Sequence, residues 1–176
     1  SLAVSRTQFN FLDGLHPSIS ELTLFGPDSE DVNPSKLLQC VHLKTLIGEF
    51  DQFHPLPVSL TRVDLKMPEF PPLIDLKSLP RLTLLSLRSF RDDLDHEREV
   101  QIVLPPSIRY LHLFHMNVTS LNFSALIHLQ VFEIGSVFFN LPLLSLSSGL
   151  KKLFLERSRN YKSPLILPVK LEEMKI

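Results

Sequence analysis

A short hydrophobic pattern recurs along the whole chain and constrains its fold more than any other feature. The pattern is an apolar residue, two variable residues, an apolar residue, one variable residue and a final apolar residue, and it returns about every 22 residues. Such alternation is typical of a strand with one buried face. The eight copies occupy residues 19–24, 43–48, 60–65, 82–87, 108–113, 129–134, 150–155 and 171–176. Because one unit cannot bury its own apolar side, the copies must stack into a continuous core.

Two kinds of segment lead into these copies. Five are extended and mostly contain Pro, as in Leu56–Leu60 and Leu104–Ile108, and Pro disfavours a helix there. The other three carry apolar residues three apart, which suits a short helical turn, and Pro80 limits the middle one to a 3₁₀-like turn. They are Leu37/Cys40/Leu43, Leu76/Leu79/Leu82 and Phe123/Leu126/Leu129. We therefore expect Cys40 to be a small core residue.

This frame and its Pro-x-Ser-Ile/Leu entry resemble the leucine-rich repeat (LRR). The units are similar to those of fungal F-box-type LRR proteins and to the FNIP repeats of amoebae. The resemblance implies an α/β solenoid of about eight repeats. Short parallel strands would form its concave face, with loops, 3₁₀ turns or short helices on the convex side. The family's Asn or Cys ladder is missing, because those positions hold Pro27, Asp51, Pro68, Phe90, Met116, Val137 and Ser158.

Composition supports one repeat domain over residues 1–176. Leucine supplies about a fifth of the 176 residues, well above ordinary usage. Both ends lack the polar capping units of a solenoid, so we expect a piece of a longer repeat domain. The chain also has 13 Phe, and we expect those in the linking segments to fill the space behind the strands: Phe50, Phe53, Phe70, Phe90, Phe123 and Phe138.

Charge and motifs exclude several classes of function. A net charge of −1 argues against a nucleic-acid partner, and no apolar run is long enough to cross a bilayer, so we expect no membrane partner. We find no phosphate loop, nucleophile elbow or triad, and we predict no enzyme, no catalytic residue, no cofactor and no small-molecule substrate. His112 with His115, and the acidic run 92–97, lack metal-site spacing, so we predict no metal.

The variable positions of the strands predict a binding surface. In each copy the third and fifth residues point away from the core, and the same position in neighbouring strands forms a row. One stretch of these rows is apolar and aromatic with Arg at its rim, as in interaction hot spots. The candidate protein-binding residues are Arg62, Leu84, Arg88, Arg109, Tyr110, His112, Phe114, Val131 and Phe154.

Protein recognition through the concave face follows as the expected function. We expect a cytoplasmic or nuclear adaptor similar to the substrate-receiving arm of an F-box-type ubiquitin ligase, since the lone Cys40 forms no internal disulfide. The alternative is an extracellular or cell-surface recognition module. It is motivated by two glycosylation patterns, Asn117-Val-Thr119 and Asn122-Phe-Ser124.

Overall fold

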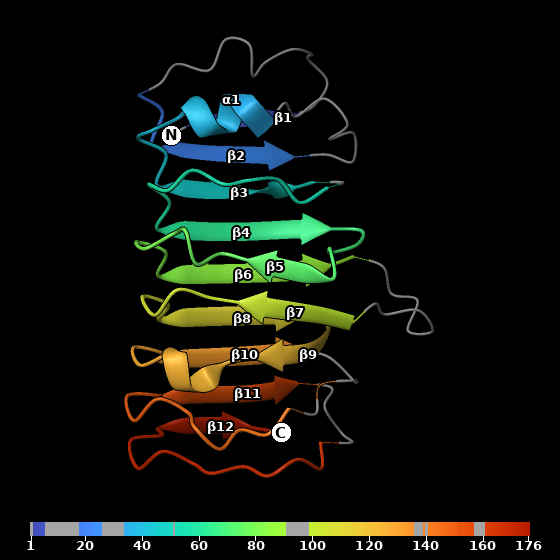
Figure 1. Ribbon diagram of the computed structural model, residues 1–176, viewed down its shortest axis with the longest axis vertical. Helices are drawn as coiled ribbons and strands as arrows, with labels where there is room; N and C mark the ends of the chain where they lie inside the picture. Colours follow the sequence, from blue (N-terminus) through green and yellow to red (C-terminus); the bar gives the residue numbers. More distant parts are fainter. Residues whose placement is uncertain are drawn as a thin grey trace.

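The computed structural model shows a solenoid of parallel strands with almost no helix (Figure 1). It describes residues 2–5, 18–25, 34–50, 52–90, 99–135, 139, 141–156 and 161–176. Nine strands form the main sheet, and all neighbouring pairs are parallel. In spatial order they are β1 (Leu2–Ser5), β2 (Glu21–Phe25), β3 (Thr45–Glu49), β4 (Arg62–Met67), β6 (Leu84–Ser89), β8 (Tyr110–Phe114), β10 (Val131–Gly135), β11 (Lys152–Glu156) and β12 (Glu173–Lys175).

Each of the eight expected spans holds one strand, which begins two residues after the first apolar position. That first position lies in the turn before the strand and is buried with the others: Leu82, Ile108 and Leu129 are all 0% exposed. β1 lies before the first span and was not expected. Parallel strands joined by return segments, with the apolar positions facing inward, confirm the solenoid architecture.

Gly48, the one mismatch in the frame, is compensated by a neighbour. A Cβ atom at Gly48 would lie 3.0 Å from the Leu24 Cβ and 3.1 Å from the Phe50 ring. Phe50 is 4% exposed, so its ring fills the space that a side chain at residue 48 would take. The missing apolar residue is therefore supplied by a linking residue.

Both kinds of entry segment close on the same hydrogen-bonded turn. The Leu82 N–H donates to the Leu79 carbonyl at 3.1 Å, and the Ile108 N–H donates to the Pro105 carbonyl at 3.4 Å. Regular helix occurs only at α1 (Pro34–Gln39) and the 3₁₀ turn η4 (Phe123–Ala125) among the described residues. These two and the turn at 76–80 are the three segments predicted to be helical turns. The middle one is a turn without helix because Pro80 cannot donate a backbone hydrogen bond.

A row of shared carbonyl groups joins the starts of the strands. The Thr83 carbonyl accepts both the Arg109 N–H at 2.8 Å and the Tyr110 N–H at 3.0 Å, and the pattern repeats at every step from Ser20 to Lys151. We call this row the carbonyl spine. The serine of the Pro-x-Ser entries adds a further bond, because the Ser107 hydroxyl donates to the Leu82 carbonyl at 2.7 Å.

A second sheet covers the back of the solenoid, where the sequence predicted only loops, turns and short helices. It consists of β5 (Leu73–Asp75), β7 (Glu99–Val103) and β9 (Asn117–Leu121), which are parallel to one another. In Figure 1 these strands run opposite to the main sheet. Val100 and Ile102 are buried while Glu99 and Gln101 are exposed, which is the alternation of a half-buried strand.

Phenylalanine fills much of the space between the sheets, as predicted, with one exception. Phe50, Phe70 and Phe123 are buried and Phe53 is half-buried, whereas the prediction for Phe90 was wrong, because its side chain is 48% exposed. Phe138 lies outside the described residues. A chain of ring contacts runs through this layer, with centroids 5.2 to 5.9 Å apart, over Phe123, Phe132, Phe139 and Tyr161.

Cys40 is a core residue, as predicted. It is 1% exposed, its Sγ lies 3.5 Å from the Lys36 carbonyl oxygen, and burial raises the pKa of its thiol. No helix among the described residues is long and apolar enough to cross a membrane.

Candidate functional site

The main sheet has one buried face and one solvent-facing side, which we call the open face. The strand register places six of the nine predicted binding residues on it in two rows. Arg88 and Phe114 are partners in a third row, and Arg109 directly precedes β8. Arg62, Leu84, Tyr110 and Val131 are successive partners in one row. His112, Glu133 and Phe154 are successive partners in the other. The placement of these side chains follows from the alternation of the strands, and the predicted rows are confirmed.

Leu84, Tyr110 and Val131 form an apolar strip across β6, β8 and β10. Tyr110 is 38% exposed, and the other two side chains are half-buried. Neighbouring strands lie about 4.8 Å apart, so the strip is about 10 Å wide. Phe154 lies outside the strip on β11, where the Lys175 ammonium stands 5.6 Å from its ring centroid. The strip is the one place on the described open face where three apolar side chains adjoin in one row.

Phe114 is held between an arginine and a glycine. The Arg88 guanidinium carbon lies 4.7 Å from the Phe114 ring centroid, within cation–π range. On the other side, a Cβ at Gly135 would lie only 2.7 Å from the Phe114 Cδ1 atom. The three residues are register partners on β6, β8 and β10. Gly135 therefore lets the ring lie flat on the sheet, a role that the sequence did not reveal.

His112 is paired with Glu133 beside the strip. Its Nδ1 atom lies 2.7 Å from the Glu133 Oε2 atom, and the two side chains are 25% and 24% exposed. Glu133 holds the same variable position on its strand as His112, but it was not among the predicted binding residues. The pair fixes the orientation of the imidazole, so His112 offers a positioned polar group next to Tyr110.

The centre of the open face differs electrostatically from its flanks. On the flanks, cations are paired with carboxylates: Lys66 with Glu49 at 3.4 Å, and Lys152 with Glu173 at 2.8 Å. The second pair's hydrogen bond lowers the pKa of Glu173 and raises that of Lys152.

At the centre, Arg88 stacks on an aromatic ring, and Arg109 has no ion pair within the described residues. On the β4 flank, Arg62 pairs with Asp64 of its own strand at 4.0 Å. An incoming carboxylate would therefore meet cationic groups on both sides of the strip.

The remaining sequence candidates are the histidine pair, the acidic run and the two glycosylation motifs. The described part of the chain contains no cluster of three or more metal-ligating side chains. The acidic run 92–97 lies outside it. Asn117 is half-buried in β9, and the Asn122 side chain caps η4 by accepting the Ser124 N–H at 3.1 Å and the Ser124 hydroxyl at 2.7 Å. Both glycosylation motifs thus lie in hydrogen-bonded secondary structure.

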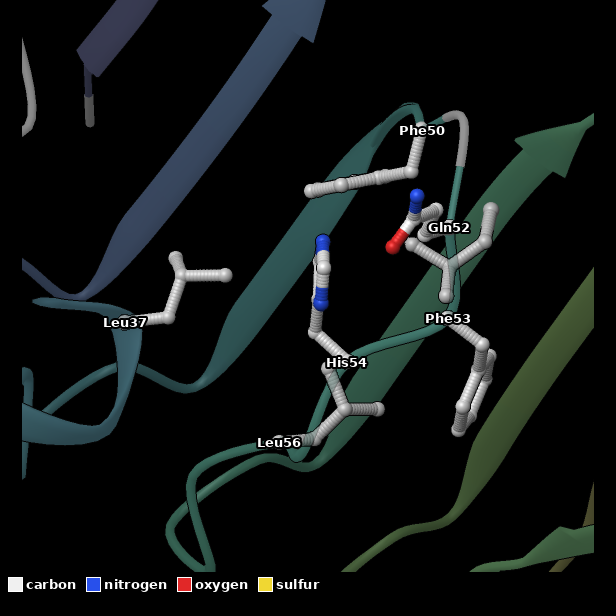
Figure 2. A pocket seen from close by; sticks show the side chains of 7 residues that line it. Leu37, Phe50, Gln52, Phe53, His54 and Leu56 are labelled. Carbon is white, nitrogen blue, oxygen red and sulfur yellow. The ribbon is translucent and has the colours of Figure 1, made fainter. Parts of the chain in front are cut away.

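A small cavity lies behind β3 and β4 (Figure 2). Its volume is about 10 Å³, which is room for one water molecule and too little for an organic ligand. The imidazole of His54 stands among its apolar walls and points toward Phe50. Burial lowers the pKa of His54, so the neutral ring is favoured. The lining residues are Leu37, Phe50, Gln52, Phe53, His54, Leu56 and Leu65.

In comparisons with known proteins, no family model, no curated protein and no solved structure matches the chain.

Proposed function

We propose that this chain is a leucine-rich-repeat solenoid of eight units whose open face binds a protein partner without catalysis. The observation that carries the proposal is the apolar strip of Leu84, Tyr110 and Val131 with arginines on both sides. An accessible apolar centre beside Arg is the composition of a protein-binding hot spot. In this proposal the chain is the recognition part of an intracellular adaptor, similar to the substrate arm of an F-box-type ubiquitin ligase.

The chemistry of the surface defines the partner more closely. A flat strip about 10 Å wide accepts one or two apolar side chains of an extended segment. Arg88 and Arg109 lack carboxylate partners among the described residues, so acidic groups beside the apolar residue complement them. We infer a segment in which Asp or Glu flanks a Leu, Phe or Tyr.

Selection from a random peptide library displayed on phage tests this proposal. We expect the selected peptides to combine an apolar residue with flanking Asp or Glu. Tyr110→Ala with Val131→Ser removes apolar area from the strip, and truncation of a hot-spot residue costs about 2 kcal/mol or more, so binding should weaken at least about thirtyfold.

Ile47→Ser provides the matched control, because Ile47 is a half-buried residue on the same face, on β3. It should leave peptide binding unchanged. Both variants should keep the circular dichroism spectrum of the parent chain. Selected peptides without acidic residues, or equal losses in the two variants, would contradict the proposed site.

A further inference from the structure

The turns that lead into the main strands line up along one edge of the solenoid, on the left in Figure 1. We call it the entry edge. From β3 to β12, the residue two places before each apolar frame lies at this edge, and the side chain at each of these positions is exposed. Val41, Val58 and Ile127 are 62%, 64% and 62% exposed, and Val169 is fully exposed. From β3 to β12 the row is Val41, Val58, Pro80, Pro106, Ile127, Ser148 and Val169.

This row is apolar except for Ser148, and we call it the ridge. The strand register stacks its members, and with about 4.8 Å between strands it extends for about 30 Å. Exposed aliphatic side chains scattered singly need no explanation, but a contiguous row is unusual on a soluble surface. Each tip lies in its own turn, and the four aliphatic tips are 62% exposed or more. The row therefore forms protruding points rather than a groove.

Most of the charged residues at the entry edge are cations. The exposed residues beside the ridge include the cations Lys44, Arg81, Arg109, Lys151 and Lys170. The single carboxylate among these positions is Glu172, which pairs with Lys151 at 3.0 Å. For Lys44, Arg81, Arg109 and Lys170, the described part of the chain provides no ion pair. His42 and His128 are exposed next to Val41 and Ile127.

We propose that the entry edge adsorbs to an anionic lipid bilayer. The cations attract acidic headgroups, and the aliphatic tips enter the boundary between headgroups and acyl chains. A fluid bilayer adapts to separate protruding tips, whereas a protein partner would need a matching socket for each of them. The expectation of no membrane partner rested on the absence of a spanning segment, and surface adsorption needs none.

Adsorption at this edge leaves the open face accessible. The ridge runs along the stacking direction, so the long axis of the solenoid would lie parallel to the bilayer, and the strands would point away from it (Figure 1). The membrane surface and the proposed peptide surface then share only Arg109, which none of the variants below changes. Each can fail without the other.

Vesicle sedimentation provides the first test. We expect the chain to bind phosphatidylcholine vesicles that contain about a third phosphatidylserine, to bind pure phosphatidylcholine weakly, and to lose binding at high salt. Arg81→Glu with Lys170→Glu should weaken binding at least about tenfold. Val58→Ser, Ile127→Ser and Val169→Ser together should weaken it by a similar factor. Arg62→Glu with Lys66→Glu makes the same charge change on the open face and should have a smaller effect.

A fluorescence experiment separates lipid insertion from simple charge attraction. The chain contains no Trp, so Ile127→Trp introduces a single reporter on the ridge. Its emission should shift to the blue on anionic vesicles and be quenched by lipids brominated on their acyl chains. Leu73→Trp, at a 53% exposed position on β5, should show neither effect. No sedimentation with anionic vesicles, full binding by the serine variant, or an unquenched Trp at residue 127 would overturn the proposal.

Discussion

The unit that ends in β6 and the unit that ends in β12 share one sequence frame but differ in burial. In the first, Leu82, Leu85 and Leu87 are all 0% exposed. In the second, Leu171 and Met174 are half-buried and Ile176 is 70% exposed. The difference is that β6 has a neighbouring strand on each side, whereas β12 has one on a single side. In a solenoid, the stacked neighbours determine how much a frame residue stabilises the fold.

Truncation of the same frame position in both units should give the largest contrast. Leu82→Ala creates a cavity in a fully buried site, so the free energy of unfolding should fall by about 2–5 kcal/mol. Leu171→Ala, at a half-buried site, should cost about 1 kcal/mol. Urea unfolding of both variants measures the difference. Equal losses would show that β12 is as well packed as β6.

Replacement of two glycines by Ala compares a crowded position on the open face, Gly135, with an uncrowded one in an entry turn, Gly149. Gly135→Ala would force the Phe114 ring away from the sheet, since the new Cβ would lie 2.7 Å from Cδ1, and overpacking of this kind costs about 1–3 kcal/mol. Gly149→Ala meets only the Ser147 hydroxyl at 3.6 Å, an ordinary contact, and should be neutral or slightly stabilising. Thermal unfolding compares them. A neutral Gly135→Ala would mean that Phe114 moves freely.

The serine of the entry turn should have a smaller effect. Ser107→Ala removes the hydrogen bond to the Leu82 carbonyl and should lower the free energy of unfolding by about 1 kcal/mol. The last unit has Lys170 at this position, so Lys170→Ser tests whether the bond can be added there. A gain of a few tenths of a kcal/mol is expected, because that unit is less well packed. No loss on Ser107→Ala would contradict a stabilising role for this bond.

A change of pH should have the smallest effect on stability, and it distinguishes His54, behind β3 and β4, from Glu173 on β12. The pKa of His54 is lowered in the folded state, so the unfolded chain binds more protons, and stability is lost as the pH falls from about 6.5 toward the folded pKa. His54→Gln should flatten this slope.

At the β12 end, the lowered pKa of Glu173 acts in a different window, below about 4.5. Urea midpoints between pH 7 and pH 3 distinguish the two contributions. An unchanged slope in His54→Gln would show that the ring is fully hydrated.

The strands and their register were predictable because the frame has period two and each unit must align its apolar residues with the next. Residues far apart in the chain, such as Arg62, Leu84 and Tyr110, could thus be placed in one row. Gly135 could not be recognised, because its importance depends on the orientation of the Phe114 ring on the neighbouring strand. The back sheet was not predicted, although Val100 and Ile102 alternate with polar residues, because residues 99–103 lie outside the repeated frame and the family resemblance implied turns or short helices there.

The carbonyl spine has a mechanical consequence. Each strand of the main sheet from β3 to β12 is attached at its start by two hydrogen bonds to one carbonyl, so successive strands keep their alignment at the entry edge whatever follows at their other ends. Units of different length differ only in the segment between the end of one strand and the entry turn of the next. Entry segments as different as α1 and the Pro57 turn can therefore precede strands that are in register. The strand starts thus stay aligned along the entry edge, so units of unequal length can be added to the solenoid without a change of register.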